Sequence, residues 1–195
     1  MFTIVNVNPL ILTVDDFISK EQCQNILNFD WKWNRSKGWD SANKSTHFTD
    51  IRTSSTVFID LKNTNIPIEL RVLKYKLSDS FNINTTRFED PQLTKYEPNQ
   101  FYKDHWDFFL EKELEDNNRV ITTILYLTDD FIGGNTTFPI LNKSVSAKAG
   151  KLLYFQYDYE YDPNIKYLTK HSGDVITSGV KQIVTFWVRK IKWPL

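Results

Sequence analysis

Residues 96–109 read Tyr96-Glu-Pro-Asn-Gln-Phe-Tyr102-Lys-Asp-His105-Trp-Asp107-Phe-Phe, and this stretch places an imidazole and a carboxylate two positions apart. In an extended strand, residues i and i+2 point to the same face, so His105 and Asp107 can bind one ion from one wall. The pattern His-x-Asp is short and has weak specificity alone. The last of the three histidines, His171, lies far downstream and precedes Lys181. Two imidazoles, one carboxylate and open coordination positions favour a non-haem Fe(II) site.

Length and composition limit the kind of protein. A chain of 195 residues with 41% hydrophobic content suits a single domain, residues 1–195. Lys plus Arg balance Asp plus Glu at 24 each, which favours neither nucleic acid nor a charged membrane surface as partner. No apolar run reaches transmembrane length, and residues 1–14 lack a basic leader, so they predict a strand rather than a signal peptide. The single cysteine, Cys23, favours a reducing, cytoplasmic location.

The first half of the chain predicts scaffold elements. Ser19 and Gln22 have the spacing of a capping box at the start of a short helix. Residues 34–50 are polar and aperiodic, which predicts a loop that could cover a site; His47 within it is interpreted as solvated surface. A second helix follows, with Pro67 in its first turn and an apolar stripe packed on a sheet. The stripe consists of Ile66, Leu70, Leu73, Leu77 and Phe81.

Short apolar runs separated by turn signals dominate the second half. They cover residues 93–102, 120–127, 136–140, 152–157 and 180–191. Many short strands without a βαβ rhythm predict a mainly β fold with flanking helices, and we expect a jelly roll. The stretch from Tyr157 to Asn164 is interpreted either as a solvated acidic loop or as a rim that selects a basic or polar substrate.

The pattern of the last predicted strand indicates which of its residues face the interior of this fold. Its two faces alternate, with Val180, Val184, Phe186 and Val188 on one and Lys181, Ile183, Thr185, Trp187 and Arg189 on the other. The first face is apolar and predicts packing. A lysine on an inward face requires an anion, because an unpaired buried charge is costly.

Taken together, the motifs resemble the prolyl 4-hydroxylase-like branch of the Fe(II)/2-oxoglutarate-dependent dioxygenases. The similarity is ordered along most of the chain. It comprises Leu12-Thr-Val-Asp-Asp-Phe-Ile-Ser, Cys23, Arg52-Thr-Ser54, Glu89-x-x-Gln92-x-x-x-Tyr96, Tyr102-x-x-His105-x-Asp107, Arg119, Tyr126-Leu, Gly133-Gly-Asn-Thr136-Thr-Phe-Pro, Gly150-Lys-Leu-Leu-Tyr-Phe, His171-Ser-Gly-x-Val-x-x-x-Gly179-x-Lys181 and Trp187.

The resemblance implies a double-stranded β-helix, the cupin-like jelly roll, with Fe(II) held by His105, Asp107 and His171. It implies that 2-oxoglutarate chelates the metal and meets Lys181 with its far carboxylate, near Tyr96 and Thr136. Tyr126 is a further possible partner of the cosubstrate. Dioxygen would be consumed and succinate and CO2 released, with ascorbate as reductant.

The resemblance also implies a peptide or protein substrate that contains proline. By the same resemblance, five residues are candidates for binding the substrate: Arg52, Ser54, Glu89, Arg119 and Trp187. Two simpler interpretations stay open: Arg119 and Glu89 as a surface ion pair, and Trp187 as core filler.

Four positions depart from the family pattern: Asn99, Asn135, Asp174 and Gln182 stand where Gly, an acidic residue, Pro and Trp are usual. None of these positions belongs to the metal or cosubstrate set, but all could reshape the substrate groove. A hydroxylase of another residue type or of a free amino acid is therefore the second interpretation, and a jelly-roll binding module without turnover is the third.

Overall fold

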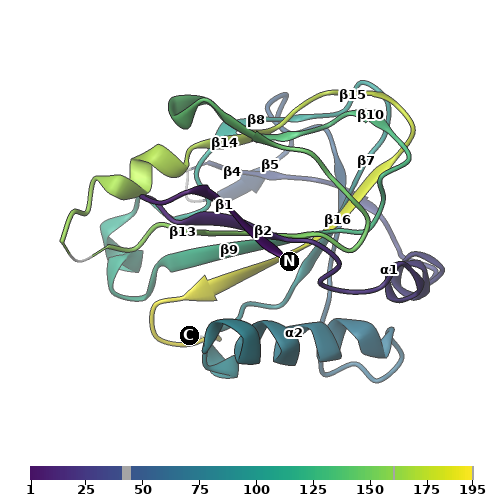
Figure 1. Ribbon diagram of the computed structural model, residues 1–195, viewed down its shortest axis with the longest axis horizontal. Coiled ribbons are helices and arrows are strands. Elements are labelled where there is room, and N and C mark those ends of the chain that lie inside the picture. Colours follow the sequence, from purple (N-terminus) through teal and green to yellow (C-terminus); the bar gives the residue numbers. More distant parts are fainter. Residues whose placement is uncertain (41–44, 160, 195) are drawn as a thin grey trace.

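The computed structural model describes residues 1–40, 45–159 and 161–194, and it is built from layers of antiparallel sheet with two helices on one side (Figure 1). A large sheet forms the middle layer. Its strands, in spatial order, are β1 (Phe2–Asn6), β2 (Ile11–Val14), β13 (Leu152–Gln156), β9 (Arg119–Tyr126), β16 (Lys181–Arg189), β7 (Gln92–Tyr96), β6 (Ser55–Phe58) and β3 (Asn34–Arg35).

Smaller sheets form the second layer, above the large sheet in the view of Figure 1. One has the order β12 (Lys143–Val145), β11 (Thr136–Phe138), β14 (His171–Gly173) and β8 (Tyr102–His105). The paired strands β10 (Ile132–Gly133) and β15 (Ile176–Ser178) extend this layer, and β4 (Gly38–Asp40) pairs with β5 (Ser45–His47). Short 3-10 turns occupy Thr85–Arg87, Lys112–Asn117, Pro139–Leu141 and Ile165–Thr169. This architecture confirms the predicted mainly β fold with flanking helices.

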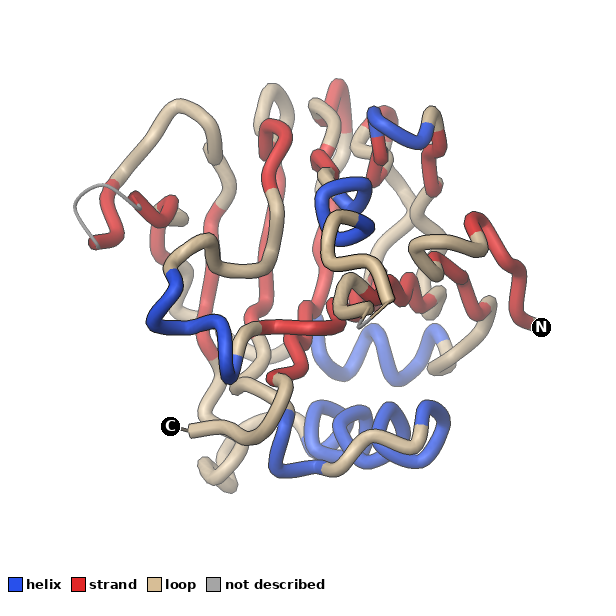
Figure 2. Tube along the Cα trace, turned by 90° about the vertical axis from the view of Figure 1, so that its left-hand side faces the viewer, coloured by secondary structure: helices blue, strands red, loops and turns tan. Residues whose placement is uncertain are grey.

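Two helices, α1 (Lys20–Leu27) and α2 (Ile68–Phe81), cover the other face of the large sheet (Figures 1 and 2). The predicted capping box of α1 is present, because Ser19 and Gln22 exchange backbone-to-side-chain hydrogen bonds. Pro67, predicted in the first turn of α2, is instead its N-cap, one residue before the helix begins. Within the described ranges, neither helix is long and apolar enough to cross a membrane.

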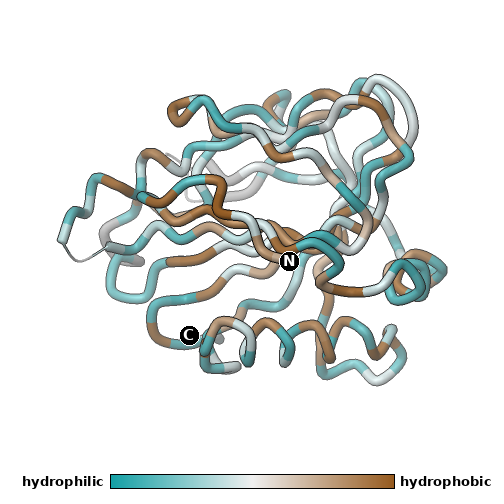
Figure 3. Tube along the Cα trace, viewed as in Figure 1, coloured by the Kyte–Doolittle hydropathy of each residue, from teal (hydrophilic) through white to brown (hydrophobic). Residues whose placement is uncertain are grey.

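Hydrophobic residues pack on both faces of the large sheet. Apolar positions are concentrated along its strands and the inner faces of the helices, whereas the outer loops are mostly hydrophilic (Figure 3). On the helix side, Leu73 of α2 packs in one cluster with Val184 and Phe186 of β16. On the other side, Ile183 of β16 joins Phe138 in a cluster between the sheets. The predicted alternation of β16 is confirmed, and its odd-numbered face is turned toward the second layer.

The run predicted as one strand over residues 93–102 is two strands in different sheets. β7 ends at Tyr96 in the large sheet, and β8 begins at Tyr102 in the small one. Asn99 between them has φ +67°, a left-handed conformation that glycine or asparagine adopts at least cost. Asn99 N–H also donates to the carbonyl of Ile176. This turn carries the chain from one layer to the other, so that Tyr96 and His105 lie in different sheets.

Two further predictions need correction. Residues 1–14 form a hairpin of β1 and β2 rather than one strand, because Asn8 and Pro9 are turn formers. Residues 34–50 contain the short strands β3, β4 and β5, while residues 41–44 of the predicted loop lie outside the described residues. In the acidic stretch, the hydroxyl of Tyr159 accepts a hydrogen bond from Leu10 N–H, so this part packs on the hairpin; Glu160 is not described.

Candidate active site

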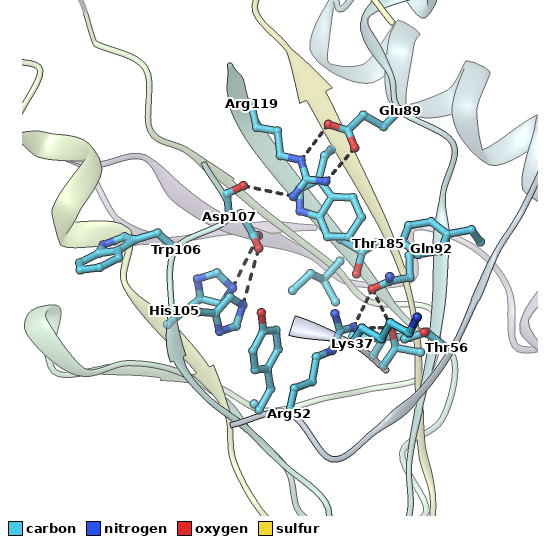
Figure 4. Close-up of a pocket in the computed structure, with 18 of the residues that line it drawn as sticks. Lys37, Arg52, Thr56, Glu89, Gln92, His105, Trp106, Asp107, Arg119 and Thr185 are labelled. Carbon is cyan, nitrogen blue, oxygen red and sulfur yellow. Dashed lines mark hydrogen bonds and ion pairs between the residues drawn. The ribbon is translucent and has the colours of Figure 1, made fainter. Parts of the chain in front are cut away.

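Two histidines and one aspartate meet where β8 and β14 pair. His105 ends β8 and His171 begins β14, and the two are directly opposite in the strand register. Asp107 lies just beyond the end of β8, so the predicted strand geometry does not extend to it. Nε2 of His105 and Nε2 of His171 each lie 3.6 Å from a carboxylate oxygen of Asp107, and one donor atom from each residue falls within 4.8 Å of the others (Figure 4).

Hydrogen bonds fix the orientation of all three groups. His105 Nδ1–H donates to the carbonyl of Lys103 at 2.8 Å, and His171 Nδ1–H donates to that of Thr169 at 3.0 Å. These bonds leave the lone pair of each Nε2 free to coordinate an ion. Thr122 Oγ1 donates to Asp107 Oδ2 at 2.7 Å, so an outer hydroxyl holds the carboxylate in place.

The electrostatics favour the metal-binding protonation states. Burial, together with the neighbouring His105, lowers the pKa of His171 to about 4. Burial alone raises the pKa of Asp107, but the two imidazoles and the Arg119 guanidinium outweigh it and hold that pKa well below its usual range. Neutral imidazoles and an ionised carboxylate are the forms that coordinate metal.

A buried ammonium lies at the end of the same interior. Lys181 is 2% exposed, and its Nζ donates to the carbonyl of Gly134 at 2.6 Å. In the described part of the chain, no carboxylate lies within 4.0 Å of this group. Burial lowers the pKa of Lys181 to about 8, against a smaller raising effect of Asp174. The group therefore still requires an anion.

The Gly-Gly turn lets the backbone approach Ile176 closely, next to Lys181. Gly134 has φ +66°, and a Cβ atom there would collide with the side chain of Ile176. Beside it, Tyr126 O–H donates to Thr136 Oγ1 at 2.8 Å, and the rings of Tyr96 and Tyr126 lie 5.5 and 5.6 Å from the ammonium. Hydroxyl groups and one cation thus form a polar pocket end.

One cavity of about 1060 Å³ contains both the metal cluster and the lysine. Ten of the eleven residues assigned to metal, cosubstrate or substrate line it: Arg52, Glu89, Tyr96, His105, Asp107, Arg119, Thr136, His171, Lys181 and Trp187. Ser54 does not line the cavity. It is fully buried behind Arg52, whose Nε lies 3.3 Å from its hydroxyl, and Tyr126 also lies behind the wall.

The interpretation of Arg119 and Glu89 as a surface ion pair is wrong. Arg119 donates to both oxygens of Glu89, at 2.7 and 2.8 Å, and Glu89 is 5% exposed. The same carboxylate lies 2.6 Å from Nε of Arg189. The Arg119 guanidinium also covers the Trp187 ring at 3.9 Å, and that ring faces the cavity rather than filling the core.

Sequence reasoning missed three contributors: Thr122, Gln92 and Arg189. Thr122 is a polar residue in the apolar strand β9, and Gln92 Oε1 accepts from Arg52 at 2.6 Å. Arg189 was placed on the inward face but not assigned to the site. A polar or charged residue within an apolar strand is the available signal for Thr122 and Arg189, whereas Gln92 already lies in the motif Glu89-x-x-Gln92-x-x-x-Tyr96.

The fold and site together define a class: a jelly-roll enzyme with a mononuclear two-histidine, one-carboxylate metal centre. Residues 91–189 match the sequence profile of the 2OG-Fe(II) oxygenase superfamily, and the chain belongs to this superfamily. It is therefore an Fe(II)- and 2-oxoglutarate-dependent enzyme that uses dioxygen, and the interpretation as a binding module without turnover is set aside.

Named relatives extend over nearly the whole chain. A putative prolyl 4-hydroxylase of Acanthamoeba polyphaga mimivirus is 28% identical over 193 residues, covering 95% of this chain and 75% of the relative. Prolyl 4-hydroxylase 1 of Arabidopsis thaliana is 29% identical over 206 residues, covering 96% and 71%.

Solved structures share the fold. A viral collagen prolyl hydroxylase from Paramecium bursaria Chlorella virus 1, in complex with 2OG, has a TM-score of 0.69 at 22% identity and covers 93% of this chain and 96% of that one. A prolyl hydroxylase from Trichoplax adhaerens, in complex with a hypoxia inducible factor peptide fragment, has a TM-score of 0.70 at 18% identity, covering 94% and 84%. The predicted jelly roll is confirmed by these neighbours.

Proposed function

We propose that this enzyme hydroxylates prolyl residues of a peptide or protein. The observation that carries the proposal is the cavity itself, which joins His105, Asp107 and His171 to the buried Lys181 and is also lined by Trp187. The prolyl 4-hydroxylase names of relatives that span nearly the whole chain support proline as the target. A volume of about 1060 Å³ favours an extended peptide over a free amino acid.

The residues present fit Fe(II) and 2-oxoglutarate. His105, Asp107 and His171 would hold the ion through two neutral nitrogens and one carboxylate oxygen. Lys181 would meet the far carboxylate of the cosubstrate, with hydroxyls of Tyr96 and Thr136 nearby. When bound, Fe(II) and 2-oxoglutarate supply oxidative decarboxylation to succinate and CO2, coupled to transfer of one oxygen atom of dioxygen to a substrate C–H bond.

The chain itself binds, orients and desolvates. Thr122 holds the Asp107 carboxylate, and the backbone carbonyls behind both histidines fix their rings. Arg52, Glu89, Arg119 and Trp187 would position the peptide, while Ser54 acts behind Arg52. Burial of the cavity end excludes water from the reaction.

We also propose that residues 1–195 act as one catalytic domain, that ascorbate keeps the iron reduced, and that the reaction takes place in the cytoplasm. The single cysteine supports the last point, because Cys23 is buried and free, as expected in a reducing compartment.

Incubation with proline-containing peptides, 2-oxoglutarate, Fe(II) and ascorbate tests the proposed function. We expect succinate release together with a mass gain of one oxygen atom on a prolyl residue, located by fragmentation mass spectrometry. Cosubstrate turnover coupled to oxygen on another residue type, with none on proline, would instead support the second interpretation.

Replacing Lys181 tests the cosubstrate pocket. Lys181→Ala removes one charge-assisted contact, worth about 1.5–3 kcal/mol, so we expect the dissociation constant of 2-oxoglutarate to rise about ten- to hundredfold. Calorimetric titration measures this under argon, and circular dichroism checks that the variant is folded. An unchanged dissociation constant would assign Lys181 to structure.

The affinity for 2-oxoglutarate should also depend on pH. Because the pKa of the free Lys181 is lowered to about 8, and a bound carboxylate raises it, binding takes up a proton above pH 8. Affinity is then full below pH 8 and falls up to about tenfold per pH unit above it. Titrations between pH 7 and 9 measure the slope. Lys181→Arg is the matched control, since a guanidinium stays charged and should flatten the profile.

A further inference from the structure

The substrate half of the cavity contains more buried positive charge than negative charge. Three largely buried guanidinium groups line it, those of Arg52, Arg119 and Arg189. Among the described residues, Glu89 is the carboxylate paired with them, while the other buried carboxylate nearby, that of Asp107, belongs to the metal site. Arg52 is 9% exposed and Arg189 4%. Charges at this depth are stable only when paired, so the excess calls for a counter-charge.

Arg119 and Arg189 share a single carboxylate. They are register partners on the neighbouring strands β9 and β16, where like charges directly opposite repel. Glu89 binds Arg119 through both oxygens and lies 2.6 Å from Arg189 Nε, but that contact lacks hydrogen-bond geometry. Arg189 Nη1 donates to a neutral acceptor, the carbonyl of Asn117. One negative charge therefore serves two positive charges.

Arg52 lies on the opposite side, and among the described residues it forms no ion pair with a carboxylate. Its partners are the neutral oxygens of Ser54, Gln92 and Thr94, and its guanidinium covers the ring of Tyr102 at 4.7 Å. Figure 4 shows the arrangement, with Arg52 on one side of the cavity, Arg119 and Glu89 on the other, and the metal ligands between them.

Binding of the metal ion and 2-oxoglutarate at the catalytic end of the cavity does not remove this excess of positive charge. A divalent ion with Asp107 and a dicarboxylate with Lys181 sum to zero charge. The remaining charged residues of the wall also cancel, because Arg35 and Lys37 stand against Asp90 and Glu111. Two positive charges, one on each side of the metal ligands, are left for the substrate.

We propose that the substrate is an acidic peptide, with carboxylate side chains flanking the target prolyl residue on both sides. Arg189, beside Arg119, binds one carboxylate and Arg52 binds the other. This inference rests on the proposed function for the target residue, but the charge preference follows from the cavity alone. Since neutral peptide carbonyls could also accept from guanidinium groups, the test compares peptides that differ only in flanking charge.

Binding of three fluorescent peptides with a central proline, flanked on both sides by Glu, Gln or Lys, tests the proposal. The protein is loaded with Mn(II) and 2-oxoglutarate, and fluorescence anisotropy gives each dissociation constant. We expect the Glu peptide to bind at least about tenfold more tightly than the Gln peptide, and the Lys peptide most weakly. The preference should decrease with added salt. Equal affinity for the Glu and Gln peptides, or a preference for Lys, overturns the proposal.

Substitution of each arginine shows which residue produces the preference for flanking glutamates. Arg189→Gln leaves Glu89 with one guanidinium, so we expect the Glu-to-Gln affinity ratio to fall about tenfold. Arg52→Gln should reduce the ratio independently, through the opposite flank. Lys62→Gln removes the same charge from an exposed loop outside the cavity and should change nothing. An unchanged ratio in both arginine variants contradicts the assignment.

The experiments distinguish failure of the proposed function from failure of the inference about acidic flanking residues. Peptides hydroxylated on proline with no dependence on flanking charge would leave the proposed function intact and remove this inference. A strong preference for the Glu peptide, with oxygen added to a residue other than proline, would retain the acidic subsites and remove the prolyl target.

Discussion

Asp107→Ala should abolish both iron binding and succinate formation. The carboxylate is the only anionic member of the donor set, and both histidine Nε2 atoms lie 3.6 Å from it. Two neutral imidazoles alone hold Fe(II) weakly. Because loss of outer groups that merely orient ligands typically costs 10–100-fold in metal affinity, we expect loss of this ligand to cost more than about 100-fold.

Anaerobic Fe(II) titration in the presence of 2-oxoglutarate measures the effect through the metal-to-ligand charge-transfer band. Asp104→Ala is the matched control, since Asp104 lies three residues earlier on β8 and makes only an exposed contact of 3.9 Å with Lys170. The control should keep the band and the turnover. A band of normal intensity in Asp107→Ala would mean that another carboxylate binds the ion.

Glu89→Gln should lower the free energy of unfolding by about 3–5 kcal/mol, the usual cost of removing one partner of a buried ion pair. The amide keeps the shape of the side chain but removes the counter-charge that Arg119 and Arg189 share. Like charges in register then repel in a poorly solvated wall.

Urea unfolding of the metal-free protein measures this change as a lower midpoint at an unchanged slope. Glu97→Gln is the control, because its ion pair with Lys95 at 3.1 Å is solvent-exposed and should contribute no more than about 1 kcal/mol. A loss in Glu89→Gln as small as in the control would show that water or the neighbouring donors already compensate the arginines.

Local patterns explain which parts of the fold the sequence predicted. The capping box of α1, the stripe of α2 and the two faces of β16 each depend on residues within a few positions of one another. Such periodicities follow from backbone geometry, so they can be recognised in the sequence without knowing which residues lie nearby in the folded protein. The turn at Asn99 was missed because its effect, moving the chain between two sheets, depends on strands far away.

The amino-acid sequence by itself determined the donor types, the inward-facing lysine and the family resemblance, because these depend on residue chemistry and order. Only the tertiary structure decided that His105 pairs with His171, that Glu89 lies between two arginines, and that Ser54 is withdrawn behind Arg52. The physical reason is strand register: it brings together residues separated by as many as 100 positions, and no local periodicity specifies which of them will face the same cavity.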